Sequence, residues 1–176
     1  MKRTIRLDTE EINNLIEDLN AYADMLTTKC LMFVQALADV GIKTAKANVG
    51  QYQNLIVFSK EVDETETGAK AIIIATDGQK IIRSWQYHGG IKTAEVSPLL
   101  MAEFGSGWHA KVLDDVAGVG QGTFPDQKHA FDPRGWWWVD ENGEKHHSTG
   151  EAPTYPMHSA SVAMVFEIQR IAEEIF

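Results

Sequence analysis

The first third of the chain has the most regular pattern of apolar positions. Apolar residues recur there at alternating steps of four and three, the heptad spacing of a helix with one apolar face. These heptad positions are Ile12, Ile16, Leu19, Ala23, Leu26, Cys30, Phe33, Leu37 and Val40. Asp8 followed by Glu11 is typical of a helix start. The pattern therefore predicts a helix over residues 8–48, about 60 Å long if it is straight.

A helix of that length is more than a small domain can cover by itself. We expect it to curve over a sheet, to break near Thr27-Thr28 or Gly41, or to lie on another subunit. Apolar stripes of this kind commonly face a sheet of the same domain. We therefore favour a core helix on a sheet over a free-standing coiled coil.

The middle of the chain predicts an antiparallel meander over residues 53–96. Asp77-Gly78 lies between two apolar runs and is typical of a type I′ hairpin turn. The acidic segment 61–68 is expected to be an exposed loop. The runs rich in apolar and β-branched residues lie at 55–58, 69–76, 80–87 and 91–96.

The second half predicts shorter elements around a long irregular segment. Ser97-Pro98 begins a short helix that ends at Gly105, so this helix occupies residues 97–105. Residues 106–134 show no period and are expected to form a variable loop. Residues 135–150, with a turn at Asn142-Gly143, read as a second hairpin. Pro156 leads into an amphipathic helix over residues 157–176. Its aromatic last residue is expected to pack against the rest of the protein.

Together these elements predict a single α+β domain over residues 1–176, with a long N-terminal helix and a C-terminal helix packed on an antiparallel sheet. The apolar content of 44% is ordinary for a globular protein. A net charge of −9, from 16 basic and 25 acidic side chains, argues against a general nucleic-acid binder. The single cysteine excludes a disulfide framework. No apolar run follows the basic N-terminus and none approaches about 20 residues, so we expect neither export nor a membrane span.

Candidate catalytic groups are few. Cys30 lies on the apolar stripe of the first helix and is interpreted as a small core residue. Ser106 lacks the strand and the spacing of a nucleophile elbow. Gly118-x-Gly120-x-Gly122 lacks the strand and helix that would aim it at a phosphate. We therefore expect no catalytic residue and no cofactor.

Potential metal ligands are present without a metal-binding spacing. No HExxH motif and no cysteine pair occur, and His146 and His147 point to opposite faces of a predicted strand. No metal site is expected, although a structural zinc site in the long loop stays an alternative. The potential ligands are His109, Asp114, Asp115, His129, His146, His147 and His158.

Three consecutive tryptophans, Trp136, Trp137 and Trp138, mark the second hairpin. Their side chains alternate between its two faces, so one face shows a large aromatic area. Exposed tryptophan is a frequent anchor of protein interfaces. We favour an interface, or cover by the long loop, over a carbohydrate platform, because no cluster of amide and carboxylate side chains accompanies the rings.

Several short motifs occur in a fixed order in the second half of the chain. In that order they resemble the small tail-completion proteins of phages, also described as minor tail, neck, head–tail joining or tail-terminator-like proteins. The resemblance covers most of the chain in layout, but in motif only residues 103–107 and 135–160. The motifs are Glu103-Phe104-Gly105-Ser106-Gly107, Gly135-Trp136-Trp137-Trp138, Asp140-Glu141-Asn142-Gly143, Ser148-Thr149-Gly150-Glu151 and Pro156-Met157-His158-x-Ala160.

The resemblance implies a structural subunit without catalytic activity. Such α+β subunits close into a hexameric ring between the tail tube and the head-side connector or collar. The particle would be a virion or a headless, tail-like bacteriocin (tailocin) assembled in the bacterial host cytoplasm, without membrane or sequence-specific nucleic-acid binding. Glu103 is expected to find a partner in Arg134 or in a neighbour's amide. The predicted subunit-interface residues are Glu103, Phe104, Gly105, Trp136, Trp137, Trp138, Pro156 and Met157.

Two other functions stay open at this point. One is a metal-dependent hydrolase that uses the histidine-rich loop. The other is a carbohydrate-binding module that uses Trp136 and Trp138.

Overall fold

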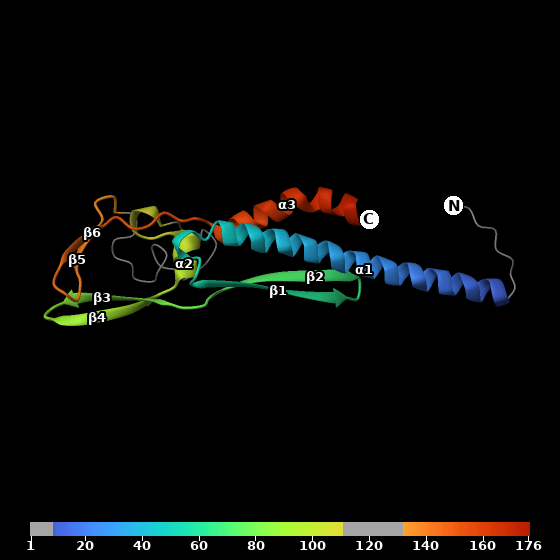
Figure 1. Cartoon of the computed structure of the whole chain (residues 1–176), viewed down its shortest axis with the longest axis horizontal. Coiled ribbons are helices and arrows are strands. Elements are labelled where there is room, and N and C mark those ends of the chain that lie inside the picture. The colour runs from blue at the N-terminus through green and yellow to red at the C-terminus, as the bar shows by residue number, and fades with distance from the viewer. Residues whose placement is uncertain (1–8, 111–131) are drawn as a thin grey trace.

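The computed structural model describes residues 9–110 and 132–176 (Figure 1). It confirms the α+β class, with a long N-terminal helix, a C-terminal helix and small antiparallel sheets. The helices are α1 (Thr9–Ala47), α2 (Pro98–Phe104) and α3 (Pro156–Ile175), with 3-10 turns at Gly50–Tyr52 and Gly107–His109. The strands are β1 (Ile56–Thr65), β2 (Gly68–Asp77), β3 (Ile81–Tyr87), β4 (Gly90–Val96), β5 (Trp136–Val139) and β6 (Lys145–Ser148).

Helix α1 is one continuous element of 39 residues, and neither Thr27-Thr28 nor Gly41 interrupts it. Its C-terminal part lies against β1, β2 and α3. Gly41 is buried there, and a Cβ at this position would lie 2.4 Å from Ile73 Cδ1 and 2.8 Å from Met164 Sδ. The glycine costs helix propensity of about 1 kcal/mol relative to alanine. In return it lets β2 and α3 approach the same turn of the helix.

The predicted hairpin at Asp77-Gly78 is wrong. β2 pairs with β1 and β3 pairs with β4, so β2 and β3 are not neighbours in a sheet. The Asp77 carboxylate instead accepts hydrogen bonds from Ser97 Oγ (3.0 Å) and the backbone N–H of Leu99 (2.9 Å), at the start of α2. The Gly78 N–H donates to the Leu55 carbonyl at 2.8 Å. Tertiary partners have therefore replaced the local turn.

The predicted meander is consequently two separate hairpins, which extend in opposite directions from the region of α2 (Figure 1). The left-handed backbone pair that a type I′ turn requires occurs at His88-Gly89, with φ of 49° and 81°. The expected acidic loop 61–68 is also wrong, because Glu61–Thr65 belongs to β1 and pairs with β2. Its acidic side chains Glu61 and Asp63 point outward and are exposed, while Val62 between them is half-buried.

The hydrophobic core is small and lies where the C-terminal end of α1, the start of β1 and α2 meet. Half-buried Leu55, Phe58, Ile81, Val96 and Leu99 pack around it. This core joins the two hairpins to α2 and to the segment that follows α1. Its buried members are Val49, Tyr52, Ile56, Met101 and Ala102.

The C-terminal third follows the prediction more closely. β5 and β6 form the expected hairpin, and Gly143 in its connection has a φ of 89°. Helix α3 then runs back along α1, and the Phe176 ring lies 6.0 Å from the Phe33 ring, edge to face. Of the predicted loop 106–134, residues 111–131 lie outside the described residues.

Candidate functional site

Glu103, one of the predicted interface residues, caps helix α3 of its own chain. Its two carboxylate oxygens accept hydrogen bonds from the backbone N–H groups of Met157 (2.8 Å) and His158 (3.0 Å). The first N–H groups of a helix have no partner within the helix, and a negative charge there is favourable. The expected partnership with Arg134 is wrong, because Arg134 pairs with Asp132 at 3.2 Å.

Two of the segments that carry the phage resemblance, residues 103–107 and 148–158, lie against each other. The Ser106 N–H donates to the Glu151 carbonyl (2.8 Å), and the Glu151 N–H donates back to Ser106 Oγ (3.1 Å). Gly105 has a φ of 67°, and a Cβ there would lie 2.5 Å from the Glu151 carbonyl oxygen. Residues 103–107 and 148–158 thus form one intramolecular junction. Gly105 and Pro156 are buried in it, while Phe104 and Met157 are half-buried.

Glu151 also connects this junction to the core through its side chain. The Tyr52 hydroxyl and Gln51 Nε2 (2.8 Å) donate to one carboxylate oxygen, and Arg83 lies 3.9 Å from the other. Burial, together with the hydrogen bond to Glu151, raises the pKa of Tyr52 to about 12. The phenol therefore stays protonated and keeps donating to the carboxylate. This network joins the 3-10 turn after α1, strand β3 and the junction.

The three tryptophans alternate as predicted, and one of them is well exposed. Trp137 is 71% exposed, whereas Trp136 and Trp138 are half-buried. Trp138 stacks on His146, with ring centroids 4.5 Å apart and an interplanar angle of 25°. Trp136 lies so close to Gly107 that a Cβ on this glycine would be 2.7 Å from the ring. Hence Trp137 is the tryptophan of the hairpin most available to another molecule.

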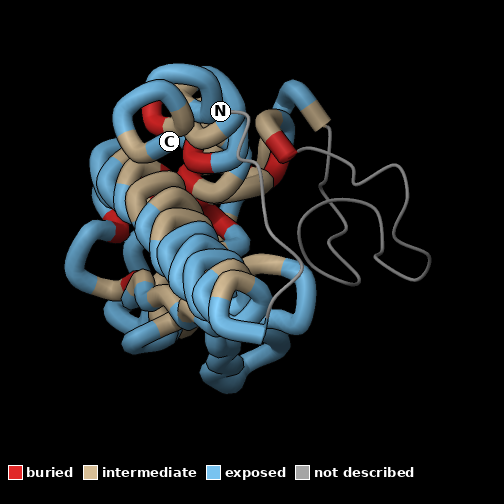
Figure 2. Tube along the Cα trace, turned by 90° about the vertical axis from the view of Figure 1, so that its right-hand side faces the viewer, coloured by how far each residue is buried: buried red, intermediate tan, exposed pale blue. Residues whose placement is uncertain are grey.

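An extended exposed apolar surface lies on the first part of α1, residues 9–26, which we call the free segment. It projects past the end of the β1–β2 hairpin and past the end of α3 (Figure 1). In Figure 2, which views the molecule from this end, nearly all of the nearest turns of α1 are exposed. Leu15 is half-buried, and the other six large apolar side chains of the segment are between 40% and 59% exposed: Ile12, Ile16, Leu19, Tyr22, Met25 and Leu26.

A second exposed apolar surface, the outer face of α3, lies opposite the side of the helix that carries buried Ala160 and Ile171. Phe166 is 80% exposed and Val165 is 65% exposed. One chain thus presents two different apolar helix surfaces. The outer face of α3 consists of Val162, Val165 and Phe166.

Helix α1 is also long and apolar enough to cross a membrane, judged by length and composition alone. Only 11% of its most apolar stretch is buried. This differs from the expectation that no segment would pass such a test. Core helices of water-soluble proteins and signal sequences pass the same test. The C-terminal part of α1 is packed against the rest of its own chain.

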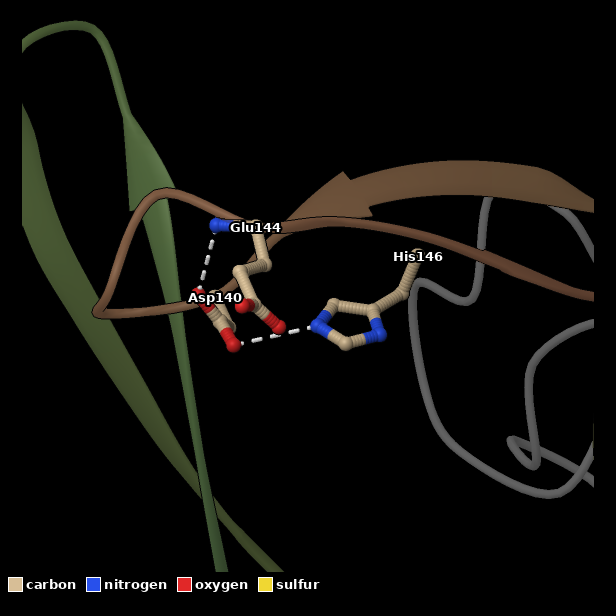
Figure 3. Close-up of side chains that lie close together, drawn as sticks. All are labelled: Asp140, Glu144 and His146. Carbon is tan, nitrogen blue, oxygen red and sulfur yellow. Dashed lines mark hydrogen bonds and ion pairs between the residues drawn. The ribbon is translucent and has the colours of Figure 1, made fainter.

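A polar cluster lies in the connection between β5 and β6 (Figure 3). One ligand atom from each of Asp140, Glu144 and His146 lies within 4.8 Å of the others, and Asp140 Oδ2 is 3.0 Å from His146 Nε2. The hydrogen bond with His146, followed by that from the Glu144 N–H, lowers the pKa of Asp140. Asp140 is therefore ionised at neutral pH.

The structure does not bring the potential ligands singled out from the sequence into one site within the described residues. His147 Nε2 lies 2.8 Å from the Arg134 carbonyl, away from His146, and His158 lies at the start of α3. Asp114, Asp115, His129 and the glycines at 118–122 lie outside the described residues.

The cluster could have been found from the hairpin register. Val139 pairs with Lys145, which puts Asp140 beside Glu144 and Trp138 opposite His146.

Comparison with protein-family models, curated proteins and solved structures finds no match to this chain. The resemblance to phage tail-completion proteins therefore stays a prediction.

Proposed function

We propose that this protein is a structural subunit of a phage or phage-tail-like particle. Its copies would form a ring at the neck, which completes the tail and joins it to the head connector or collar. The observation that supports this most is the free segment of α1, a helix about 27 Å long that carries large apolar side chains beyond the body of its own chain.

Exposed apolar area of this size favours association. Covering apolar surface is worth about 25 cal/mol per Å², and contiguous exposed apolar patches commonly mark interaction sites. The free segment continues the heptad whose later position Phe33 meets Phe176 at the end of α3. The same apolar stripe therefore runs on past the end of α3, and a helix from a neighbouring copy can extend that packing.

The presence of two different apolar surfaces favours a ring. In a head-to-tail contact, one surface of a subunit meets a different surface of the next, and such contacts close into a ring when the rotation fits. The free segment and the outer face of α3 are two such surfaces. We therefore propose that the free segment of one copy lies on the outer face of α3 in the next copy.

Sedimentation velocity and negative-stain electron microscopy test this function. Wild-type protein is expected to form rings, alone or after addition to tails isolated from particles that lack it. Leu19→Glu places a charge in the free segment and is expected to abolish both assembly and tail binding. Asn20→Glu, a similar charge change at an exposed polar position of the same segment, is the matched control and is expected to assemble.

A wild-type chain that stays monomeric at every concentration and does not bind tails would contradict the proposal. The same protein should be floated with phosphatidylcholine and phosphatidylglycerol vesicles. Vesicle binding that Leu19→Glu abolishes, in a chain that forms no rings, would assign the free segment to a membrane instead.

A further inference from the structure

Three side chains that can ligate a metal converge at the tip of the β5–β6 hairpin (Figure 3). Asp140 directly follows β5, Glu144 directly precedes β6, and His146 lies on β6. Their ligand atoms lie within 4.8 Å of one another. Ligands of one tetrahedral zinc ion lie about 3.3 Å apart, from bond lengths near 2.0–2.1 Å. Glu144 is exposed, so its side chain has room to rotate toward the other two ligands.

Two of these side chains are held in place by groups outside the cluster. Asn142, on the loop, donates its backbone N–H to Asp140 Oδ1 at 2.9 Å, which leaves Oδ2 directed at the cluster. The His146 ring stacks on Trp138, which fixes the plane of the ring. These contacts limit the orientations of Asp140 and His146, and a hydrogen bond such as that to Asp140 orients a metal ligand for binding.

The charge balance of the cluster favours a cation. Two carboxylates lie close together, and like charges at such a distance repel each other. Within the described residues, neither Asp140 nor Glu144 forms an ion pair with a lysine or an arginine, and the ion pair of Asp140 is with His146. A bound divalent ion would compensate both carboxylates at once.

The donor set indicates the class of ion. One imidazole nitrogen and two carboxylate oxygens suit a first-row divalent transition metal better than Ca²⁺ or Mg²⁺, which prefer oxygen alone, or Cu⁺, which prefers sulfur. We propose that Asp140, Glu144 and His146 bind such an ion, with water in the remaining positions. The ion would connect the two ends of the loop and stiffen the hairpin that exposes Trp137.

Calorimetric titration of the full chain with Zn²⁺, after removal of metal with a chelator, tests this site. Wild type is expected to bind one ion per chain at the cluster. Glu144→Gln is expected to bind at least tenfold more weakly. Glu141→Gln, which makes the same change at an exposed residue of the same loop, is the matched control and is expected to bind like wild type.

Two histidine variants, measured with Co²⁺ in place of Zn²⁺, give a second and independent test. The visible absorption of bound Co²⁺ is expected to be lost in His146→Gln and retained in His147→Gln, whose ring faces the Arg134 carbonyl. Circular dichroism of each variant checks that the chain is folded. Equal Zn²⁺ binding by Glu141→Gln and Glu144→Gln, or Co²⁺ spectra that His146→Gln leaves unchanged, would overturn the proposal. Neither result depends on ring assembly, so the metal site and the proposed function are tested independently of each other.

Discussion

The two parts of α1 share one heptad pattern and differ in what covers it. The earlier heptad positions, such as Ile16 and Leu19, are exposed, whereas the later ones, from Cys30 to Val40, are half-buried against the rest of the chain. The periodicity of apolar residues therefore specifies which face of a helix must be covered. It does not specify whether the cover comes from the same chain or from another one.

The largest expected effect comes from placing the same charge in each part of α1. Ala38 is 2% exposed, and Ala38→Asp buries a carboxylate without a partner, so we expect a loss of about 3 kcal/mol or more in the free energy of unfolding. Ala23 is an exposed heptad position. Ala23→Asp should therefore lower the free energy of unfolding by only about 0.7 kcal/mol, the lower helix propensity of aspartate relative to alanine, which both variants share. Urea unfolding of the monomer measures both. Equal losses would show that the free segment is covered within the monomer.

The hairpin of tryptophans offers a second comparison of covered and uncovered apolar area. Trp136→Ala removes a half-buried ring beside Gly107 and is expected to cost about 2–3 kcal/mol in the free energy of unfolding. Trp137→Ala removes a ring that is 71% exposed and should change this free energy by less than about 0.5 kcal/mol. Thermal unfolding followed by circular dichroism distinguishes them, and the reverse order would mean that Trp137 is the buried ring.

A smaller effect is expected from the cap of α3, which supports the outer face of that helix. Tyr155 at the start of α3 provides no side-chain cap, so Glu103 supplies it. Glu103→Ala is expected to cost about 1–2 kcal/mol in the free energy of unfolding. Glu141→Ala, in an exposed loop, is the control and should be close to neutral. An unchanged midpoint of urea unfolding for Glu103→Ala would rule out this role.

Hydrogen exchange compares the free segment with the packed part of α1 residue by residue. Amides of the free segment have no covering element among the described residues, so they are expected to exchange fastest within α1 in the monomer. Amides around Ala38 and Ala45, which are buried, should be the slowest. Assembly should slow exchange in the free segment and leave the other part unchanged. Uniform protection along the monomeric helix would remove the distinction between the two parts.

The sequence predicts elements well where local periodicity determines them. Helix α1, the β5–β6 hairpin and helix α3 all follow from apolar spacing and turn residues, whereas the spacing left open whether α1 is continuous. It fails where a side chain has a distant partner. Asp77 belongs to the start of α2, about 20 residues away, and not to a turn, and Glu103 belongs to α3. Such partners lie far apart in sequence, so no local pattern reveals them.

The candidate sites show the same limit. Glu103, Gly105, Pro156 and Met157 stood out as interface residues, and each has a role inside the chain at the junction with α3. The cluster of Asp140, Glu144 and His146 was missed because no known spacing contains it. Only the hairpin register brings Asp140 and Glu144 to His146.

The most direct test of the account is photo-crosslinking between two differently labelled copies. Light-isotope protein that carries a photoreactive residue at position 19, in the free segment, is mixed with heavy-isotope protein under assembly conditions. The linked peptides are identified by mass spectrometry. The account predicts a link from position 19 of one copy to the region of Val165 and Phe166 on α3 of the other. Links from position 19 only to the free segment of the other copy, or to no other copy, would contradict it.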